Sequence, residues 1–323
     1  MTHPESTPLV SVLIPLYNHA AYIKRCLDSI LEDGYPNIEI VIIDDGSKDD
    51  SAALAELWHS ANKADAVTRF ELITRPNKGL TKTLNELVAL AGGDYIVVLA
   101  SDDYLLPGGI AARLEYLQSN PHKLAVFGDC LVVDGNNTLT YPSGIADLYG
   151  GHIECLMNDE LLTMELIFNW CVPGPGFMAR RDLFDRIGLY DENLTVEDWD
   201  MYLRIAAQGL RGFIPKTVAA YRYHESNSVH NGAMKMAQLN SLMQTAWKNH
   251  LAFQGAQRFG LLYNHFKVKN YTLKKYTAVA QGRTMTALAR RMAYKLLYWL
   301  SPRRMMLYWL SIRRYKKILG SLN

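Results

Sequence analysis

Short apolar runs alternate with amphipathic segments along the first 133 residues. Buried strands are predicted at 10–15, 38–43, 70–74, 95–99 and near 124–133. Apolar residues recur at helical spacing between them, which predicts helices at about 20–32, 49–61, 81–90 and 107–119. Strands that alternate with helices favour an α/β fold, in which a mostly parallel sheet carries helices on both faces.

The pattern changes twice after residue 133. It weakens over 134–175, where turn residues are frequent, and then predicts a short strand at 177–180, a helix at 197–208 and a strand at 212–223. Beyond 233 the chain is helical in pattern, basic and aromatic to its end. We therefore expect an α/β domain over 1–232, in two parts of about 1–133 and 134–232, and a helical extension over 233–323.

The composition is that of a folded protein, with 49% hydrophobic and 20% charged residues. The start of the chain is polar and carries no apolar signal segment, and no run of about 18 uncharged apolar residues occurs. None of the cysteines forms a Cys-x-x-Cys pair, so we expect buried free thiols in a reducing cytosol at Cys26, Cys130, Cys155 and Cys171.

Charge is divided unevenly along the chain. All 32 acidic residues lie at or before Glu225, whereas 17 of the 34 Lys and Arg residues follow Asn231. Within 286–319 a Leu-Tyr-Trp-Leu-Ser segment occurs twice, at 297–301 and 307–311, each time close to an Arg-Arg pair. Basic helices rich in Trp and Tyr favour an anionic membrane surface. A helical pair packed on the acidic domain, or a dimer contact, is the alternative, and no nucleic-acid-binding motif accompanies the charge.

Acidic turns follow two of the predicted strands. Asp44 and Asp45 end the second strand, and Asp102 and Asp103 follow the fourth. In parallel sheets ligands bind beyond the carboxyl ends of the strands, where these turns fall. A hard divalent ion such as Mg²⁺ or Mn²⁺ takes carboxylate and phosphate oxygens together, so the turns favour a site for a metal and a phosphorylated ligand.

These turns belong to a longer series of motifs that resembles family 2 glycosyltransferases over about residues 9–230. The series is VSVLIPLYN at 10–18, VIIDDGS at 41–47, NKGL at 77–80, AGGDY at 91–95, SDD at 101–103, ED at 197–198 and RYH at 222–224. The resemblance implies the GT-A fold and metal-dependent, inverting transfer of a hexosyl or N-acetylhexosaminyl group from a nucleotide-sugar, with UDP as the default nucleotide. It also implies a glycan or lipid-linked glycan acceptor in cell-surface polysaccharide synthesis, at the inner face of the cell membrane.

The resemblance also implies donor-binding positions, each of which has a plainer structural reading as a turn or helix cap. Asp45 is the expected contact to the base. Family members often carry an Arg where this chain has Leu84, so Arg75, Lys78 or Lys82 would have to supply that phosphate contact. The other expected donor contacts are Pro15, Tyr17, Asn77, Gly79, Ser101, Asp102 and Arg222.

The metal and the general base complete the expected site. The family's usual Asp-x-Asp-Asp pattern begins here with Ala100, which leaves open whether Asp102 or Asp103 binds the metal directly, with His224 as a further ligand. In the pair Glu197–Asp198, at the start of a predicted helix, the resemblance makes Asp198 the general base. Glu197 suits a helix start.

Two other functions are compatible with parts of the pattern. A nucleotidyltransferase would be expected to show a Gly-rich phosphate loop with Lys or Arg after the first strand, and PLYN at 15–18 is not such a loop. A nucleotide-sugar-binding module without transfer activity is the second alternative, and Ala100 and Leu84 leave room for it. Donor hydrolysis would distinguish that module from an enzyme.

Overall fold

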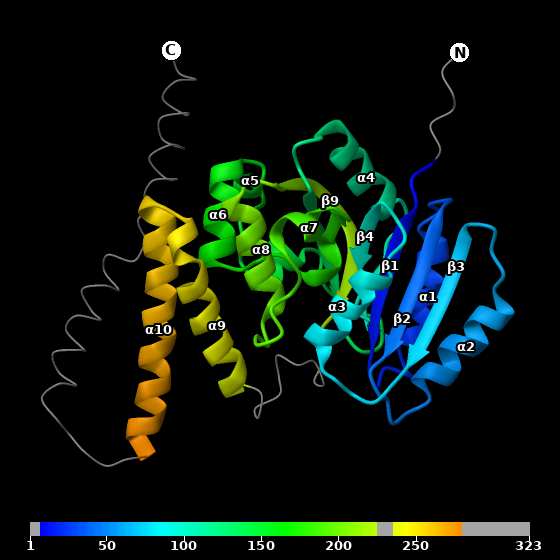
Figure 1. Ribbon diagram of the computed structural model, residues 1–323, viewed down its shortest axis with the longest axis horizontal. Coiled ribbons are helices and arrows are strands. Elements are labelled where there is room, and N and C mark those ends of the chain that lie inside the picture. The colour runs from blue at the N-terminus through cyan, green and yellow to red at the C-terminus, as the bar shows by residue number, and fades with distance from the viewer. Residues whose placement is uncertain (1–6, 225–234, 280–323) are drawn as a thin grey trace, which may run out of the picture. The chain divides into compact units, whose positions relative to one another are not determined.

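The computed structural model describes residues 7–224 and 235–279, with side chains as far as residue 268 (Figure 1). The chain divides into two compact units, Met1–Lys235 and Met236–Asn323. The first unit is a mixed α/β structure that contains all the strands of the described residues. The expected α/β class is therefore confirmed, with a mostly parallel arrangement in the first half of the sheet.

The first half of the sheet follows the predicted alternation of strands and helices. Four parallel strands lie in the order β3-β2-β1-β4, formed by β1 (Val10–Leu16), β2 (Ile38–Asp44), β3 (Val67–Thr74) and β4 (Tyr95–Val98). The helices between them are α1 (Ile23–Glu32), α2 (Ser51–Ala61) and α3 (Leu80–Leu90). The strand predicted at 70–74 begins three residues earlier, at Val67.

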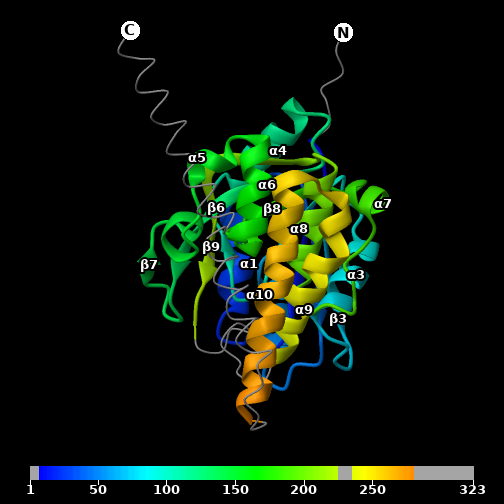
Figure 2. The ribbon, with the colours of Figure 1, turned by 90° about the vertical axis from the view of Figure 1, so that its left-hand side faces the viewer.

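Side chains of the central strands alternate between two apolar layers. Val12, Ile14, Ile40 and Ile42 pack into one core together with residues of α1, α2 and α4 (Gly109–Ser119). The intervening residues, such as Leu13, are also buried, on the face that α3 covers (Figures 1 and 2). Helices on both faces explain why β1 and β2 are almost continuously apolar in sequence.

Antiparallel pairing extends the sheet beyond β4. Strand β8 (Phe177–Arg180) is antiparallel to both β4 and β6 (Ala125–Val133), and β9 (Arg211–Arg222) is parallel to β6. The short β5 (Tyr104–Leu105) pairs with β9, and β7 (Leu139–Tyr141) pairs with β6. The pairing of β9 with β5 brings the end of β9 next to the loop after β4, which carries the acidic turn.

The segment with a weak pattern, 134–175, contains more helix than the sequence predicts. It forms a short π-helical turn η1 (Gly144–Leu148), α5 (Ile153–Leu156), α6 (Asp159–Phe168) and the turn η2 (Gly174–Gly176). Two helices follow β8, namely α7 (Leu183–Ile187) and α8 (Glu197–Ala207). Helices α6 and α8 lie side by side (Figure 2), and the Trp199 indole Nε1 donates to the Leu166 carbonyl at 2.8 Å.

The second unit begins near α9 (Lys235–Asn249), which is followed by η4 (His250–Ala252) and α10 (Gly255–Val279). No helix of the described residues is both long and apolar enough to cross a membrane. The paired basic segments predicted at 286–319 lie outside the described residues. The four cysteines are all buried and free, as expected from their spacing.

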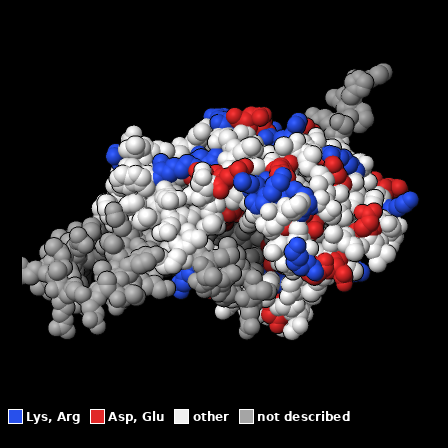
Figure 3. All heavy atoms as spheres, turned by 60° about the horizontal axis from the view of Figure 1, so that its bottom comes forward, with Lys and Arg blue, Asp and Glu red and all other residues white. Residues whose placement is uncertain are grey.

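Lys and Arg side chains are interspersed with Asp and Glu on the face drawn in Figure 3. The basic excess of the sequence belongs to the residues after Asn231. The face drawn in Figure 3 therefore carries no large patch of only positive or only negative side chains.

Candidate active site

The candidate side chains lie at one edge of the sheet, at or just after the ends of four strands. Strands β1, β2 and β4 are parallel, so the loops after them lie at the same edge and carry His19, Asp45 and Asp102. Strand β9 ends at Arg222, two residues before His224. The Arg222 backbone N–H donates to Asp103 Oδ1 at 2.8 Å, which ties the end of β9 to the acidic loop.

The loop after β1 turns sharply at Asn18, which has a φ of 53°. Asn tolerates this left-handed conformation better than most residues because its side chain can bond locally. Here Asn18 Oδ1 accepts the Lys48 N–H at 2.7 Å, and Ser51 Oγ accepts the His19 N–H at 2.8 Å. The turn places the His19 ring beside the acidic loop, with Nδ1 at 2.7 Å from Ser101 Oγ.

His19, Asp102 and His224 form a compact cluster with potential metal ligands. Asp102 Oδ2 lies 3.1 Å from His224 Nε2 and 3.8 Å from His19 Nε2, and the candidate ligand atoms all lie within 4.8 Å of one another. Burial lowers the pKa of His19, which favours its neutral, metal-binding form. Burial alone would raise the pKa of Asp102, but the His224 hydrogen bond and His19 hold it below its ordinary value.

The chemistry of this cluster fits a divalent ion. Metal ligation needs a deprotonated carboxylate and neutral imidazoles, and the surroundings favour these forms at Asp102 and at His19. Two imidazole nitrogens suit a transition-metal ion better than Mg²⁺, which prefers oxygen ligands. The sequence singled out Asp102 and His224, and the structure brings them together; it adds His19.

Asp103, the other predicted metal ligand, lies outside this cluster. Its side chain is 2% exposed, and its Oδ1 accepts the Arg222 N–H. Burial, followed by the neighbouring charge of Asp102, raises its pKa well above the ordinary value. The structure therefore favours a supporting role for Asp103 in joining β9 to the loop after β4.

Arg222 is almost fully buried and binds protein acceptors. Its Nε donates to the Asp102 carbonyl at 2.7 Å, its Nη1 to the Asp134 carbonyl at 2.9 Å and its Nη2 to Asn137 Oδ1 at 2.6 Å. Its guanidinium also lies 4.6 Å from the centroid of the Tyr22 ring. This arrangement indicates that Arg222 holds the Asp102 loop. It favours that role more than the predicted contact with the donor diphosphate.

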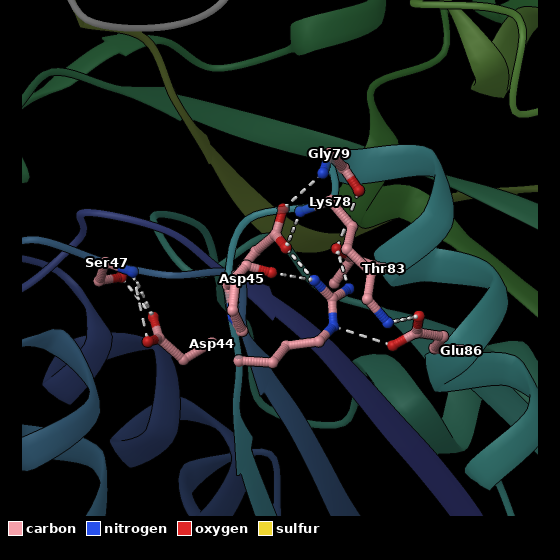
Figure 4. Close-up of polar contacts among 9 residues, drawn as sticks. Asp44, Asp45, Ser47, Lys78, Gly79, Thr83 and Glu86 are labelled. Atoms are coloured by element: carbon pink, nitrogen blue, oxygen red, sulfur yellow. Dashed lines mark hydrogen bonds and ion pairs between the residues drawn. The ribbon is translucent and has the colours of Figure 1, made fainter.

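Asp45 is held by a network of hydrogen bonds at the end of β2 (Figure 4). Its carboxylate accepts the backbone N–H groups of Lys78 and Gly79, at 2.8 and 2.9 Å, and a bond from the Arg75 guanidinium. Arg75 Nε also donates to Glu86 at 2.9 Å. The carboxylate expected to contact the base is thus fixed in orientation by the loop after β3, and Arg75 belongs to this network.

The remaining predicted donor contacts surround these two groups. Tyr17 is 45% exposed and Asn77 is also exposed, whereas Pro15 lies within β1 opposite Ile43. Gly79 is the N-cap of α3 and has a φ of 93°, a conformation that favours glycine. Ser101 is buried and bonded to His19.

Glu197 and Asp198 are the first two residues of α8. Asp198 keeps part of its surface exposed, yet burial raises its pKa to about 6. Burial and the adjacent Asp198 raise the pKa of Glu197 to about 8. The Trp199 N–H donates to Asp198 Oδ1 at 2.8 Å. A carboxylate with a pKa near 6 suits a general base that works close to neutral pH.

Tyr149 ends the turn η1, in the segment whose pattern is weak, and was not among the residues predicted from the sequence. Burial raises the pKa of its phenol to about 12, and the charges of Asp198 and Asp103 act in the same direction. His19 was not predicted either, because its place in the site depends on the turn at Asn18.

Comparison with known proteins identifies the family of the chain. The sequence model of glycosyl transferase family 2 matches residues 11–188, which is more than half of the chain. A chondroitin synthase of Escherichia coli is 30% identical over 203 residues, a match that covers 62% of this chain and 27% of that protein. The chain thus matches about a quarter of the length of that synthase.

Two solved structures share the fold. A mannosyltransferase from Pyrobaculum calidifontis, in complex with GDP-Man and Mn²⁺, superposes with a TM-score of 0.61 at 19% identity, covering 94% of this chain and 84% of the other. S. aureus TarS 1-349, in complex with UDP-GlcNAc, gives a TM-score of 0.57 at 17% identity, covering 80% and 72%. The fold is that of the GT-A glycosyltransferases, and the chain belongs to glycosyl transferase family 2.

Proposed function

We propose that the protein transfers a hexosyl or N-acetylhexosaminyl group from a nucleotide-sugar to an acceptor hydroxyl by a single displacement with inversion. The observation that carries this proposal is the presence of two carboxylates in different environments within the domain. One lies in the His19–Asp102–His224 cluster, and the other is Asp198 at the start of α8. Family membership establishes a glycosyltransferase, and these environments support the roles that we propose for the individual residues.

His19, Asp102 and His224 would hold the divalent ion, which would stabilise the negative charge that develops on the leaving diphosphate. Arg222 keeps Asp102 in place through the bond from Nε to the Asp102 carbonyl. Mn²⁺ is the ion that this ligand set favours over Mg²⁺, and the related mannosyltransferase was solved with Mn²⁺.

Asp198 would accept the proton from the attacking acceptor hydroxyl. The new bond forms between the acceptor oxygen and the anomeric carbon, while the bond from that carbon to the diphosphate oxygen breaks on the opposite face. The nucleoside diphosphate leaves with the electron pair of the broken bond, and Asp198 keeps the proton. Attack opposite the leaving group inverts the anomeric centre and needs no covalent enzyme intermediate.

The base of the donor would lie between Tyr17 and the Asp45 network. Asp45 can accept the imide N–H of uracil, and its two backbone donors and Arg75 hold the carboxylate for this contact. Tyr17 is exposed beside the same strand ends and offers a ring face for stacking. We therefore propose a UDP-sugar donor, with Asn77, Gly79, Ser101 and Pro15 lining the nucleotide.

The acceptor would be a glycan or lipid-linked glycan in cell-surface polysaccharide synthesis. The similarity to a chondroitin synthase and the basic, aromatic residues after 233 support this part. We propose that these residues place the protein on the anionic inner face of the cell membrane.

A donor screen tests the proposal directly. The full-length protein would be incubated with Mn²⁺ and UDP-N-acetylglucosamine, UDP-glucose or GDP-mannose, and nucleotide release and binding would be measured. We expect release from a UDP-sugar in the presence of Mn²⁺ and loss of release in EDTA. Binding of a donor without any release would favour the non-catalytic module, and full activity in excess EDTA would contradict the metal site.

A further inference from the structure

The turn between β6 and β7, residues 134–138, is fixed by its own hydrogen bonds. The Asp134 N–H donates to the Thr138 carbonyl at 2.9 Å, and the Asp134 carboxylate accepts the N–H groups of Asn136 and Thr138 at 2.8 and 2.9 Å. Asn137 has a φ of 65°, in the left-handed region, which Asn tolerates better than most residues. The turn therefore has a defined backbone form, although residues 136–138 are exposed.

The Asn137 side chain joins this turn to a buried guanidinium. Its Oδ1 accepts a hydrogen bond from Arg222 Nη2 at 2.6 Å, and the Asp134 carbonyl of the same turn accepts one from Arg222 Nη1 at 2.9 Å. Arg222 is 1% exposed. Two acceptors of the turn thus bind the outer nitrogens of a group that water hardly reaches.

Arg222 holds the acidic loop at two points. Its Nε donates to the Asp102 carbonyl at 2.7 Å, and its backbone N–H donates to Asp103 Oδ1 at 2.8 Å. A guanidinium is planar, and its donors point in fixed directions. The acceptors at the outer nitrogens therefore also set the direction in which Nε meets the Asp102 backbone.

The same turn packs beside the proposed metal ligands. A Cβ atom added to Gly135 would lie 3.4 Å from the Tyr22 hydroxyl and 4.0 Å from His224 Cβ. The Tyr22 ring lies 5.1 Å from the His224 ring and 5.9 Å from the His19 ring, and the Arg222 guanidinium lies 4.6 Å from its centroid. The turn, the guanidinium and both imidazoles therefore share Tyr22 as a neighbour.

We propose that Asn137 is a positioning residue for the metal cluster and acts through Arg222. Its amide oxygen orients the guanidinium, which holds the Asp102 backbone where Asp102 Oδ2 lies 3.1 Å from His224 Nε2. The inference rests on the proposed function, in which His19, Asp102 and His224 bind Mn²⁺. Groups that orient metal ligands matter strongly, because their loss typically lowers metal affinity by about 10–100-fold.

Two substitutions separate the side chain of Asn137 from its backbone conformation. Asn137→Gly keeps the left-handed conformation, which glycine favours, and removes the acceptor. Asn137→Asp keeps an acceptor oxygen and also tolerates this conformation. Asn136→Gly is the matched control, because it makes the same change one residue earlier and leaves the backbone N–H bond to Asp134 in place.

The test measures metal binding apart from catalysis. Mn²⁺ alone would be titrated into each full-length variant, with the free ion followed by electron paramagnetic resonance and folding followed by Tm. Hydrolysis of UDP-N-acetylglucosamine, or of the most active donor in the screen, would be measured against Mn²⁺ concentration. For Asn137→Gly we expect Mn²⁺ affinity to fall by about 10–100-fold and half-maximal hydrolysis to need correspondingly more Mn²⁺, with kcat largely restored at saturating Mn²⁺.

Asn137→Asp should bind Mn²⁺ at least as tightly as the unaltered protein, and Asn136→Gly should bind it equally well. The inference is overturned if Asn137→Gly keeps normal Mn²⁺ affinity, if Asn136→Gly loses as much, or if Asn137→Asp fails to retain binding. Asp102→Asn, titrated in parallel, identifies failure of the proposed function. Normal Mn²⁺ binding by Asp102→Asn would remove the metal assignment itself, whereas its loss together with normal binding by Asn137→Gly would remove only the positioning role.

Discussion

Replacing Asp198 by Asn should inactivate the protein and stabilise it at the same time. Asp198 lies beside Glu197 at the start of α8, and burial raises its pKa from 3.8 to about 6. Its charge also contributes to raising the pKa of Glu197 to about 8. Asn keeps the size and the hydrogen-bonding oxygen of the side chain but carries no charge and accepts no proton from an acceptor.

The size of the stability gain follows from the pKa shift. A rise from 3.8 to about 6 corresponds to about 3 kcal/mol. Because Asp198 is partly exposed, solvent screening reduces this to about 1–2 kcal/mol. The folded state binds the Asp198 proton more tightly than the unfolded state, so the ionised side chain lowers stability as the pH rises from about 4 through 6. The variant's advantage should be absent below pH 4 and complete above about pH 7.

The assay measures Tm by calorimetry at pH 4 and pH 7.5, and donor hydrolysis at pH 7.5. A change of 1 kcal/mol moves Tm by about 2–4 °C for a domain of this size, so Asp198→Asn should raise Tm by about 2–8 °C at pH 7.5. Hydrolysis should fall by about 10²–10⁴-fold, the usual contribution of a general base, while donor affinity stays nearly constant.

Asp200→Asn is the matched control on the same helix. Asp200 is fully buried but bonded to Arg204 at 2.9 Å, so its loss should lower Tm. A lower Tm for Asp198→Asn at both pH values, or a gain equal at pH 4 and 7.5, would refute the reasoning that burial of this charge is unfavourable. Full hydrolysis by Asp198→Asn would refute its role as base.

Three further predictions concern the metal, the donor base and the basic segment. In a Mn²⁺ titration, Asp102→Asn should reduce metal-dependent hydrolysis far more than Asp103→Asn, and an equal loss would contradict the cluster. Arg75→Ala, which frees the Asp45 carboxylate, should weaken UDP binding by about 10-fold in calorimetry; unchanged affinity would remove Asp45 from the base site. The full-length protein should sediment with anionic liposomes at low salt and less at high salt, whereas a chain ending near Gln281 should stay in solution and still hydrolyse donor. Absence of sedimentation at low salt would contradict the membrane proposal.

The hydrophobic pattern was sufficient for the first half of the fold because both faces of β1 and β2 are covered. Such strands read as continuous apolar runs, and the turns after them become conspicuous. The same pattern could not resolve 134–175, where α6 is short and buries the acidic Glu165 on its apolar side. A buried carboxylate looks like a surface residue in sequence, because its partners His152, Asn169 and Cys171 are visible only in space.

The site, like the fold, could be predicted from the sequence only in part. Strand-end reasoning and family resemblance singled out Asp102 and His224, which the structure brings within 3.1 Å of each other. Neither argument could show whether Asp102 or Asp103 binds the metal, because this depends on which carboxylate accepts the backbone N–H at the end of β9. His19 also required knowledge of the turn at Asn18, whose left-handed conformation directs the ring toward Ser101.

The carboxylates of this site differ in role because their neighbours differ. Asp102 has two imidazoles beside it, which keep it ionised and suited to a cation. Asp198 lies beside Glu197 at the start of α8, and burial raises its pKa to about 6, close to neutral pH. Environments that push the pKa values of two acids in opposite directions assign them different chemistry. The role of Asp198 should therefore change with its neighbour. An imidazole in place of Glu197 should lower the pKa of Asp198 and weaken Asp198 as a base, although no catalytic side chain is replaced. In Glu197→His we expect the acidic limb of the pH profile of donor hydrolysis to move to lower pH and kcat to fall. A move of that limb to higher pH would contradict the argument.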